Sequence, residues 1–285
     1  FCFLKNGFIF AFSKLKRKMV NIVIPIYKEE PSGNDIISIK RVFRVLKEYP
    51  ITFVHPKSLD IRAYEEFGKV TFRDFDDAYF KSIDGYNQLM LSIDFYEAFT
   101  EKYILIYQTD AYIFRDDLLF WCKKDYDYIG APWIRRREKA PIIKKIWDSS
   151  ICFIKQAINY KGNRKTQKNK ILLYNEVGNG GFSLRKREKF IEVLKQLTEQ
   201  TAVYLKPSNR STFYAEDVFF SIEPKRNGID FKKPNYKEAC LFSIENKVRK
   251  ALAFNNQILP MGCHRWEKEN REIWAQFIKD ETEGF

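Results

Sequence analysis

The chain has 285 residues and a mass of 34.1 kDa, and 45% of its residues are hydrophobic. That size fits one large domain with a well-packed core. The net charge is +13, but residues 134–170 alone contain twelve Lys or Arg and two acids, which gives +10. Because the remainder is nearly balanced, the charge argues against a uniformly basic nucleic-acid binder and favours a balanced domain with one basic insertion.

The five cysteines are an odd number and form no C-x-x-C pair, which argues against a disulfide framework or a structural zinc site. This usage fits a reducing cytosol. His55 and His264 are the two histidines of the chain, and no G-x-S-x-G motif occurs. A hydrolase that depends on a Ser-His-Asp triad is therefore disfavoured.

The N-terminal residues 1–18 differ from the rest of the chain. An apolar run from Phe1 to Phe12 is too short to span a bilayer, and the basic residues follow it, whereas a signal peptide has them first. We interpret residues 1–18 as an upstream or added segment and Met19 as the natural start, with a peripheral membrane anchor as the alternative. The predicted domain then covers residues 19–285.

The first third of the chain alternates between predicted strands and helices. Apolar and β-branched runs predict strands at 20–27, 51–54, 70–72 and 103–107, and helical spacing predicts helices at 35–47, 59–67 and 86–99. Pro25 marks the end of the first strand. This alternation predicts an α/β fold with a mostly parallel central sheet flanked by helices, whose strands end on one rim.

The second half contains shorter elements. Apolar residues spaced among lysines predict one or two amphipathic helices between Ile142 and Ile158, followed by a polar loop at 162–170. Such a helix either packs on the domain with its lysines in water or contacts an anionic membrane. Further along, we expect a helix at 188–197, a loop at 198–210, a helical or extended segment at 218–222, an ambiguous stretch at 246–259 and a helix at 266–279.

Gln108-Thr109-Asp110 directly follows the most apolar predicted strand. A buried strand that ends in a carboxylate places it at the C-terminal edge of the sheet, where open α/β sheets bind ligands. A hard divalent cation carrying phosphates needs oxygen ligands at such a place. Many strands also end in Asp simply because Asp favours turns, so partners elsewhere in the chain decide the matter.

Three later clusters are candidates for those partners. Glycines at 178, 180 and 181 allow either close approach of the backbone to a ligand or only a tight turn. Glu216 and Asp217 suit a helix N-terminus, although one of them could also act as a general base. His264 stands alone in sequence, and a lone histidine is more often structural than a ligand.

Together, the clusters resemble those of the GT-A fold, nucleotide-sugar-dependent glycosyltransferases. More narrowly, the chain is similar to an uncharacterised group of glycosyltransferase-like domains from bacterial surface-polysaccharide settings. The resemblance runs from Asn21 to about Trp266. It depends on the order and spacing of Val23-Ile24-Pro25-Ile26-Tyr27, Tyr107-Gln108-Thr109-Asp110, Ile129-Gly130-Ala131-Pro132-Trp133, Gly178-Asn179-Gly180-Gly181-Phe182-Ser183-Leu184-Arg185, Glu216-Asp217-Val218 and Gly262-Cys263-His264.

The resemblance implies a role for each cluster. Asp217 would be the base that deprotonates an acceptor hydroxyl, with inversion at the anomeric carbon, and Glu216 would position the sugar or acceptor. Asp110 and His264 would hold Mn²⁺ or Mg²⁺ on the diphosphate. The implied binding residues for the nucleotide-diphosphate sugar are Pro25, Ile26, Tyr27 and Lys28 by the nucleoside, Asn87, Gln108, Thr109 and Asp110, and Trp133, Asn179, Gly180 and Gly181 by the sugar.

One position departs from the pattern of the resembled enzymes. Gln108 stands where their Asp-x-Asp motif has its first carboxylate. A neutral amide binds a cation poorly, so the resemblance implies a weakly held metal, and turnover without a metal is an open alternative.

The resulting expectation is a hexosyltransferase-type glycosyltransferase of cell-surface polysaccharide synthesis. Its acceptor would be a glycan or a lipid-linked sugar, and it would be cytoplasmic, either free or held at the inner face of an anionic membrane by residues 134–170. A sugar nucleotidyltransferase is one alternative, but it needs a glycine-rich loop near the N-terminus, and residues 27–33 contain one glycine and one lysine. A basic, non-enzymatic binder of membrane or nucleic acid is the other, although no nucleic-acid partner is expected.

Overall fold

The computed structural model describes residues 19–135, 141–157, 172–207, 214–268 and 271–278. The predictions for residues 1–18 and for the loop at 162–170 lie outside these ranges.

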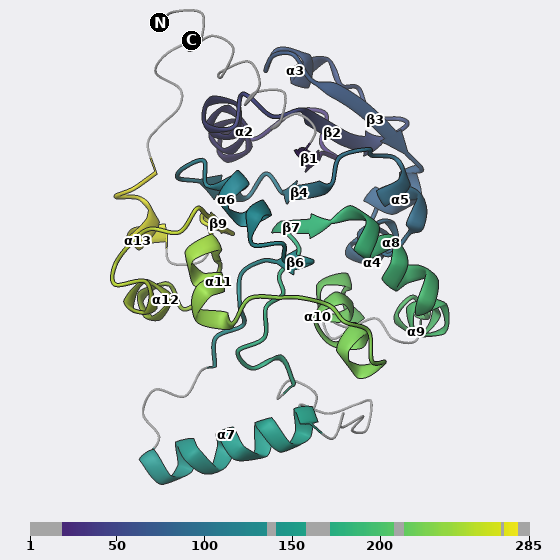
Figure 1. Ribbon diagram of the computed structural model, residues 1–285. Coiled ribbons are helices and arrows are strands. Elements are labelled where there is room, and N and C mark those ends of the chain that lie inside the picture. Colours follow the sequence, from purple (N-terminus) through teal and green to yellow (C-terminus); the bar gives the residue numbers. More distant parts are fainter. Residues whose placement is uncertain (1–18, 136–140, 158–171, 208–213, 269–270, 279–285) are drawn as a thin grey trace, which may run out of the picture.

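A six-stranded sheet forms the centre of the molecule, with the strand order β3-β2-β1-β4-β7-β6 (Figure 1). The first four strands of that order are mutually parallel, whereas β7 runs antiparallel to both β4 and β6. The predicted α/β fold with a mostly parallel sheet is therefore confirmed. The bounds are β1 (Val20–Pro25), β2 (Ile51–Pro56), β3 (Thr71–Phe75), β4 (Tyr103–Tyr107), β6 (Tyr128–Ile129) and β7 (Phe182–Lys186).

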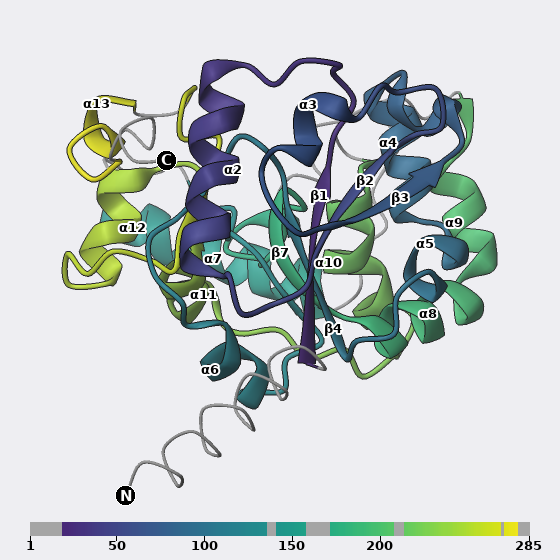
Figure 2. The same ribbon diagram turned by 90° about the horizontal axis from the view of Figure 1, so that it is seen from above.

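Helices cover both faces of this sheet (Figure 2). Alternate residues of β1 and β4 point to opposite sides, as the two-residue period of a strand requires. Val20, Ile22 and Ile24 pack in one hydrophobic cluster with Leu105, while Val23 belongs to the other. The first cluster includes residues of α2 (Gly33–Val45), α3 (Arg62–Glu65) and α6 (Leu118–Lys123); the second includes residues of α4 (Ile83–Met90), α5 (Ile93–Glu97), α8 (Arg187–Gln196) and α10 (Glu216–Arg226).

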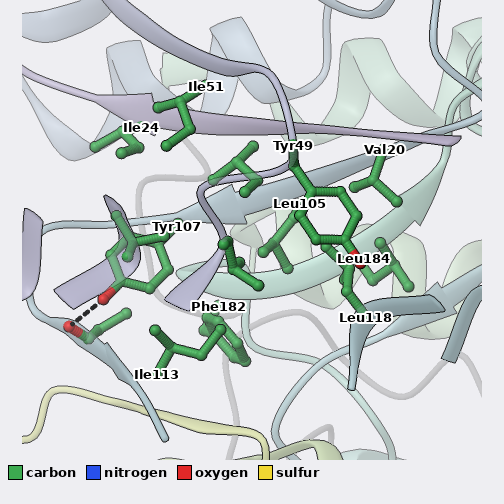
Figure 3. Packing of buried hydrophobic residues seen from close by; sticks show 14 of the residues in the cluster. Val20, Ile24, Tyr49, Ile51, Leu105, Tyr107, Ile113, Leu118, Phe182 and Leu184 are labelled. Carbon is green, nitrogen blue, oxygen red and sulfur yellow. Dashed lines mark hydrogen bonds between the residues drawn. The ribbon is translucent and has the colours of Figure 1, made fainter. Parts of the chain in front are cut away.

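The first cluster continues beyond the main sheet (Figure 3). Tyr107 at the end of β4 packs beside Phe182, and its hydroxyl donates a 3.2 Å hydrogen bond to the carbonyl of Ala111. That bond satisfies a buried phenol at the point where the chain leaves the main sheet. The chain segment just after β4 is thereby fixed against the core.

A second, three-stranded sheet begins there. It has the order β5-β9-β8, with β5 (Ala111–Ile113) antiparallel to β9 (Gly262–His264) and β8 (Ser243–Ile244) parallel to β9. A third hydrophobic cluster joins it to neighbouring short helices. These are α11 (Tyr236–Phe242), α12 (Val248–Phe254) and α13 (Arg271–Trp274).

Several element predictions were wrong in detail. The stretch 86–99 is two helices because the Ser92 hydroxyl accepts from the Phe95 backbone N–H and starts α5 anew. Residues 198–210 were predicted as a loop, yet α9 (Thr198–Tyr204) is helical and buries Tyr204. Within the described ranges, the helices expected at 59–67 and 266–279 are only four residues long, as α3 and α13. A short 3-10 helix, η1 (Asp77–Phe80), lies between β3 and α4.

The predicted amphipathic helix of the basic insertion is present as α7 (Ile142–Ala157). It stands apart from the two sheets and their covering helices (Figure 1). Among the described residues, α7 and every other helix lack the length or the apolar character needed to cross a bilayer.

Candidate functional site

The chain segments after β4 and before β7 meet at the C-terminal edge of the parallel strands. Tyr107 pairs with Phe182 in the antiparallel register, and the Gln108 N–H donates a 2.8 Å hydrogen bond to the Gly181 carbonyl. The predicted carboxylate segment and the predicted glycine segment are therefore neighbours, although Gln108 and Gly181 are 73 residues apart in sequence. This is the edge where α/β sheets bind ligands.

Glycine at 180 and 181 is required by the side chains that close on them. A Cβ atom at Gly181 would lie 2.1 Å from His264 Nε2 and 2.6 Å from Gln108 Oε1. A Cβ atom at Gly180 would lie 1.9 Å from Glu216 Oε1. The two glycines thus bring a histidine, an amide and a carboxylate around one short stretch of backbone.

The register of the second sheet places His264 beside Asp110. Ala111 pairs with His264, and the imidazole Nε2 lies 2.9 Å from Asp110 Oδ1 and 3.1 Å from Gln108 Oε1. The other ring nitrogen, Nδ1, lies 3.5 Å from Glu245 Oε1. His264 is therefore held between two carboxylates in a buried position.

This arrangement perturbs the charges of the pair. Burial lowers the pKa of His264, but the hydrogen bonds to Asp110 and Glu245 outweigh it and raise the pKa to about 9. Burial raises the pKa of Asp110, while His264 and Lys268 lower it by more, so the net shift is downward. Lys268 Nζ lies 3.6 Å from Asp110 Oδ2 and adds a second positive charge.

Asp110 and His264 offer one oxygen and one nitrogen ligand to a divalent cation. Within the described ranges, no cluster of three or more His, Cys, Asp or Glu side chains is arranged to hold a metal. Glu245, on the second ring nitrogen, matches the carboxylate partner that orients many metal-binding imidazoles. Asp110 and His264 could therefore hold a divalent cation that takes its other ligands from elsewhere, and its binding would have to displace the imidazole proton.

The start of α10 forms the opposite side of the site. The Glu216 N–H donates a 3.1 Å hydrogen bond to Asn87 Oδ1, so a residue of α4 caps α10 from outside. Glu216 Oε1 forms a 2.9 Å ion pair with Arg185 Nη2, and both side chains are almost fully buried. Arg185 also donates to the Gly180 carbonyl at 3.3 Å, which ties α10 to the glycine segment.

Asp217, next along α10, has an unusual environment. Burial and the negative charge of Glu216 raise the pKa of its carboxyl to about 7. Its Oδ1 accepts a 2.7 Å hydrogen bond from the Val218 N–H, which opposes the rise. A carboxylate with a pKa near 7 can hold and release a proton at neutral pH, as a general base must.

The predicted nucleoside loop lies at the same edge and is connected to the site through Asp35. Lys28 Nζ donates to Asp35 Oδ2 at 2.8 Å, and Asp35 also forms a hydrogen bond with the Thr109 side chain. Pro25 and Ile26 have buried side chains, whereas that of Tyr27 is 60% exposed. Within the loop, Tyr27 and Lys28 are therefore the side chains accessible to a ligand.

Trp133 forms a wall next to the glycine segment. A Cβ atom at Gly178 would lie 2.0 Å from the six-membered ring of Trp133, so the indole occupies the space that a side chain at 178 would need. Asn179 follows with a left-handed φ of 66°, and its buried Oδ1 has no hydrogen-bond partner among the described residues. The same is true of Glu216 Oε2. Buried oxygens of this kind indicate where a ligand's donors could bind.

The structure thus brings the predicted site residues of all four clusters to one edge of the sheet, with Trp133 and residues 25–28 at its margins. Sequence reasoning missed several residues of this site. Arg185 was part of a motif but was given no role, and no sequence pattern indicated Asp35, Glu245 or Tyr86. The hydroxyl of Tyr86 is buried close enough to Glu216, Arg185 and Asp110 for their charges to affect its pKa. The one available signal for Glu245 was a carboxylate at the end of a short, mostly apolar run; Asp110 likewise comes shortly after an apolar strand.

The fold has solved relatives. The galactosyltransferase LgtC, determined with donor and acceptor sugar analogs, is 12% identical, with a TM-score of 0.51 over 90% of this chain and 95% of that one. Mouse xyloside xylosyltransferase 1 and the Aspergillus fumigatus core-mannan synthase A in its Mn/GDP form are also 12% identical, each with a TM-score of 0.45. They cover 86% and 73% of this chain, and the matches span 97% and 70% of their own chains.

The likeness to LgtC, together with the sheet order, defines a GT-A-type glycosyltransferase fold. A family model described as "Protein of unknown function (DUF5672)" matches residues 69–264, and the chain belongs to that family. Those residues include β4, β7, α10 and β9, which carry the site. A search of curated proteins found no match.

Proposed function

We propose that this protein transfers a hexosyl group from a nucleotide-diphosphate sugar to a hydroxyl of a glycan or lipid-linked acceptor. One observation carries the proposal. The Asp110–His264 pair lies against Gly181, and Glu216 lies against Gly180, at the ligand-binding edge of a GT-A-type sheet, with Asp217, whose pKa is about 7, next to Glu216 in sequence. In this proposal, Asp217 is the proton acceptor, and the Asp110–His264 pair binds the diphosphate next to the glycine backbone.

The chain's own groups account for most of the chemistry. Asp217 takes the proton as the acceptor oxygen attacks the anomeric carbon, and the bond from that carbon to the diphosphate breaks. Attack opposite the leaving group inverts the anomeric configuration. Lys28 and Tyr27 would contact the nucleoside, and Lys268 would offset the charge of the leaving diphosphate. Mn²⁺ or Mg²⁺ held by Asp110 and His264 would add Lewis-acid stabilisation of that leaving group.

Two features limit the strength of metal binding in this proposal. Gln108 supplies an amide where a second carboxylate would bind a cation more tightly, and it already lies 3.1 Å from His264 Nε2. The cation would therefore bind weakly without the donor and tightly only with the diphosphate. Assembly of a cell-surface polysaccharide, at or near the cytoplasmic face of a membrane, is the setting we propose for this activity.

A screen of nucleotide sugars with Mn²⁺ tests the proposal. We expect one donor to release its nucleoside diphosphate in an acceptor-dependent reaction, and NMR of the product should show an inverted anomeric centre. Release of pyrophosphate from a nucleoside triphosphate and a sugar phosphate would instead identify a nucleotidyltransferase. Transfer with retention would contradict the role of Asp217 as the base on the acceptor.

A further inference from the structure

Helix α7 exposes a large apolar surface. The exposed fractions of Ile142, Ile143 and Phe153 are 75%, 83% and 71%. Ile146, Trp147 and Ile154 are 62%, 67% and 53% exposed. Scattered apolar residues on a surface need no explanation, but six large ones on one 16-residue helix form a patch that marks an interaction site.

The spacing of these six residues makes α7 strongly amphipathic. Positions 142, 146 and 153 form one row along the helix, and positions 143, 147 and 154 form the adjacent row. At about 100° per residue, both rows fall within one half of the helix circumference, and the lysine positions 144, 145 and 155 fall in the other half. The helix carries a single acid, at position 148.

Charge selects the occupant of this face. Residues 134–170 carry +10 of the net +13, so two copies of this insertion would repel each other. A nucleic acid would satisfy the lysines but would leave the isoleucine, tryptophan and phenylalanine side chains in water. An anionic bilayer can bind both halves of the helix, because its acyl chains contact the apolar half and its phosphate headgroups pair with the lysines.

The described segments on either side of the insertion lie next to the candidate site. Pro132 and Val177 form a β-bridge, and Trp133 exchanges backbone hydrogen bonds with Glu176 and Asn175 at 3.0 and 2.9 Å. Residues 132–133 and 175–177, which flank the insertion in sequence, are therefore paired beside the Trp133 wall. A surface bound by the insertion would accordingly lie on the Trp133 side of the site.

We propose that α7 lies in the headgroup region of an anionic phospholipid bilayer, with its apolar half toward the acyl chains. This binding is independent of the transfer activity. One consequence rests on the proposed function: the acceptor is anchored in the same membrane, and its hydroxyl reaches the site from the side of Trp133.

Vesicle flotation tests the binding without any measurement of activity. The full-length protein is mixed with vesicles of phosphatidylglycerol and phosphatidylcholine, or of phosphatidylcholine alone. We expect recovery with the anionic vesicles, a loss of about tenfold or more in affinity with phosphatidylcholine, and a similar loss between about 0.1 and about 0.5 M NaCl. Equal recovery with both vesicle types would overturn the proposal.

Two variants localise the binding to α7. The double variant Ile143→Ser/Trp147→Ser changes only exposed side chains and should weaken binding about tenfold or more. The matched control Ile258→Ser removes an exposed apolar side chain elsewhere, at 54% exposure, and should bind like the parent. Unchanged binding by the double variant would overturn the proposal. So would a lipid-free dimer, seen by light scattering, that the double variant disperses, because the apolar face would then belong to a second copy.

Discussion

Replacing Asp217 with Asn should remove activity and, at the same time, stabilise the protein at alkaline pH. Asn is nearly the same size as Asp, and its side-chain oxygen can still accept from the Val218 N–H, as Asp217 does at 2.7 Å. The variant therefore removes the titrating group with little change in packing. Loss of a positioned general base lowers kcat by about 10² to 10⁴-fold.

The stability change follows from proton linkage. Burial and Glu216 raise the pKa of Asp217 from 3.8 to about 7, so between these values the folded protein holds a proton that the unfolded chain releases. The contribution of Asp217 to the stability of the parent is therefore most favourable below about pH 4, falls as pH rises to about 7, and then stays level. At about 1.4 kcal/mol per pKa unit, the ionised carboxylate costs about 4 kcal/mol above pH 7.

Urea unfolding at pH 5 and pH 8 measures this effect. Asp217→Asn should gain up to about 4 kcal/mol over the parent at pH 8, and appreciably less at pH 5. The control Asp94→Asn changes an exposed carboxylate on α5 and should stay within about 0.5 kcal/mol of the parent at both values. An equal stability difference at both pH values, or an active Asn variant, would refute the assigned environment or role of Asp217.

Three other substitutions probe the rest of the site. Gly181→Ala should cost about 1–3 kcal/mol of stability, measured by thermal unfolding, and most of the activity, because the added Cβ would meet the buried His264 imidazole. Gly33→Ala is the control, because the space around Gly33 is open. Arg185→Met should lower the free energy of unfolding, measured in urea, by about 3–5 kcal/mol because it leaves the Glu216 carboxylate buried without its cation. Adding Glu216→Gln should restore part of this lost stability, and strictly additive losses in the double variant would contradict the ion pair. Gln108→Asp adds a carboxylate and should lower the Mn²⁺ concentration at half-maximal turnover severalfold; an unchanged value would argue against a cation at this edge.

The order of strands and helices in the first half was predictable because each element carries a local signal. Val20–Pro25 and Tyr103–Tyr107 are apolar runs that suit strands buried on both faces. The break between α4 and α5 was missed because the apolar spacing continues across it, while the deciding contact is a single Ser92 cap. α9 was missed because its polar sequence is held in place by the packing of Tyr204, a tertiary effect.

Asp110, Gly180, Gly181 and Asp217 could be proposed as site residues from the sequence because each lies in a recognisable local pattern. Its supporting residues could not be predicted in the same way. Glu245 acquires its position only because β8 runs parallel to β9 and so brings the carboxylate to His264. That pairing joins segments far apart in the chain, and no local pattern encodes it.

Acceptor-dependent release of nucleoside diphosphate by matched variants tests the central claim most directly. With the donor found in the screen, Asp110→Asn and Asp217→Asn should each lose about 10²-fold or more of the parent's turnover, while Asp94→Asn should keep it. The proton acceptor and the diphosphate-binding pair would then belong to one active site. Turnover by either site variant at the parent's rate would contradict the assignment of this sheet edge as the site of sugar transfer.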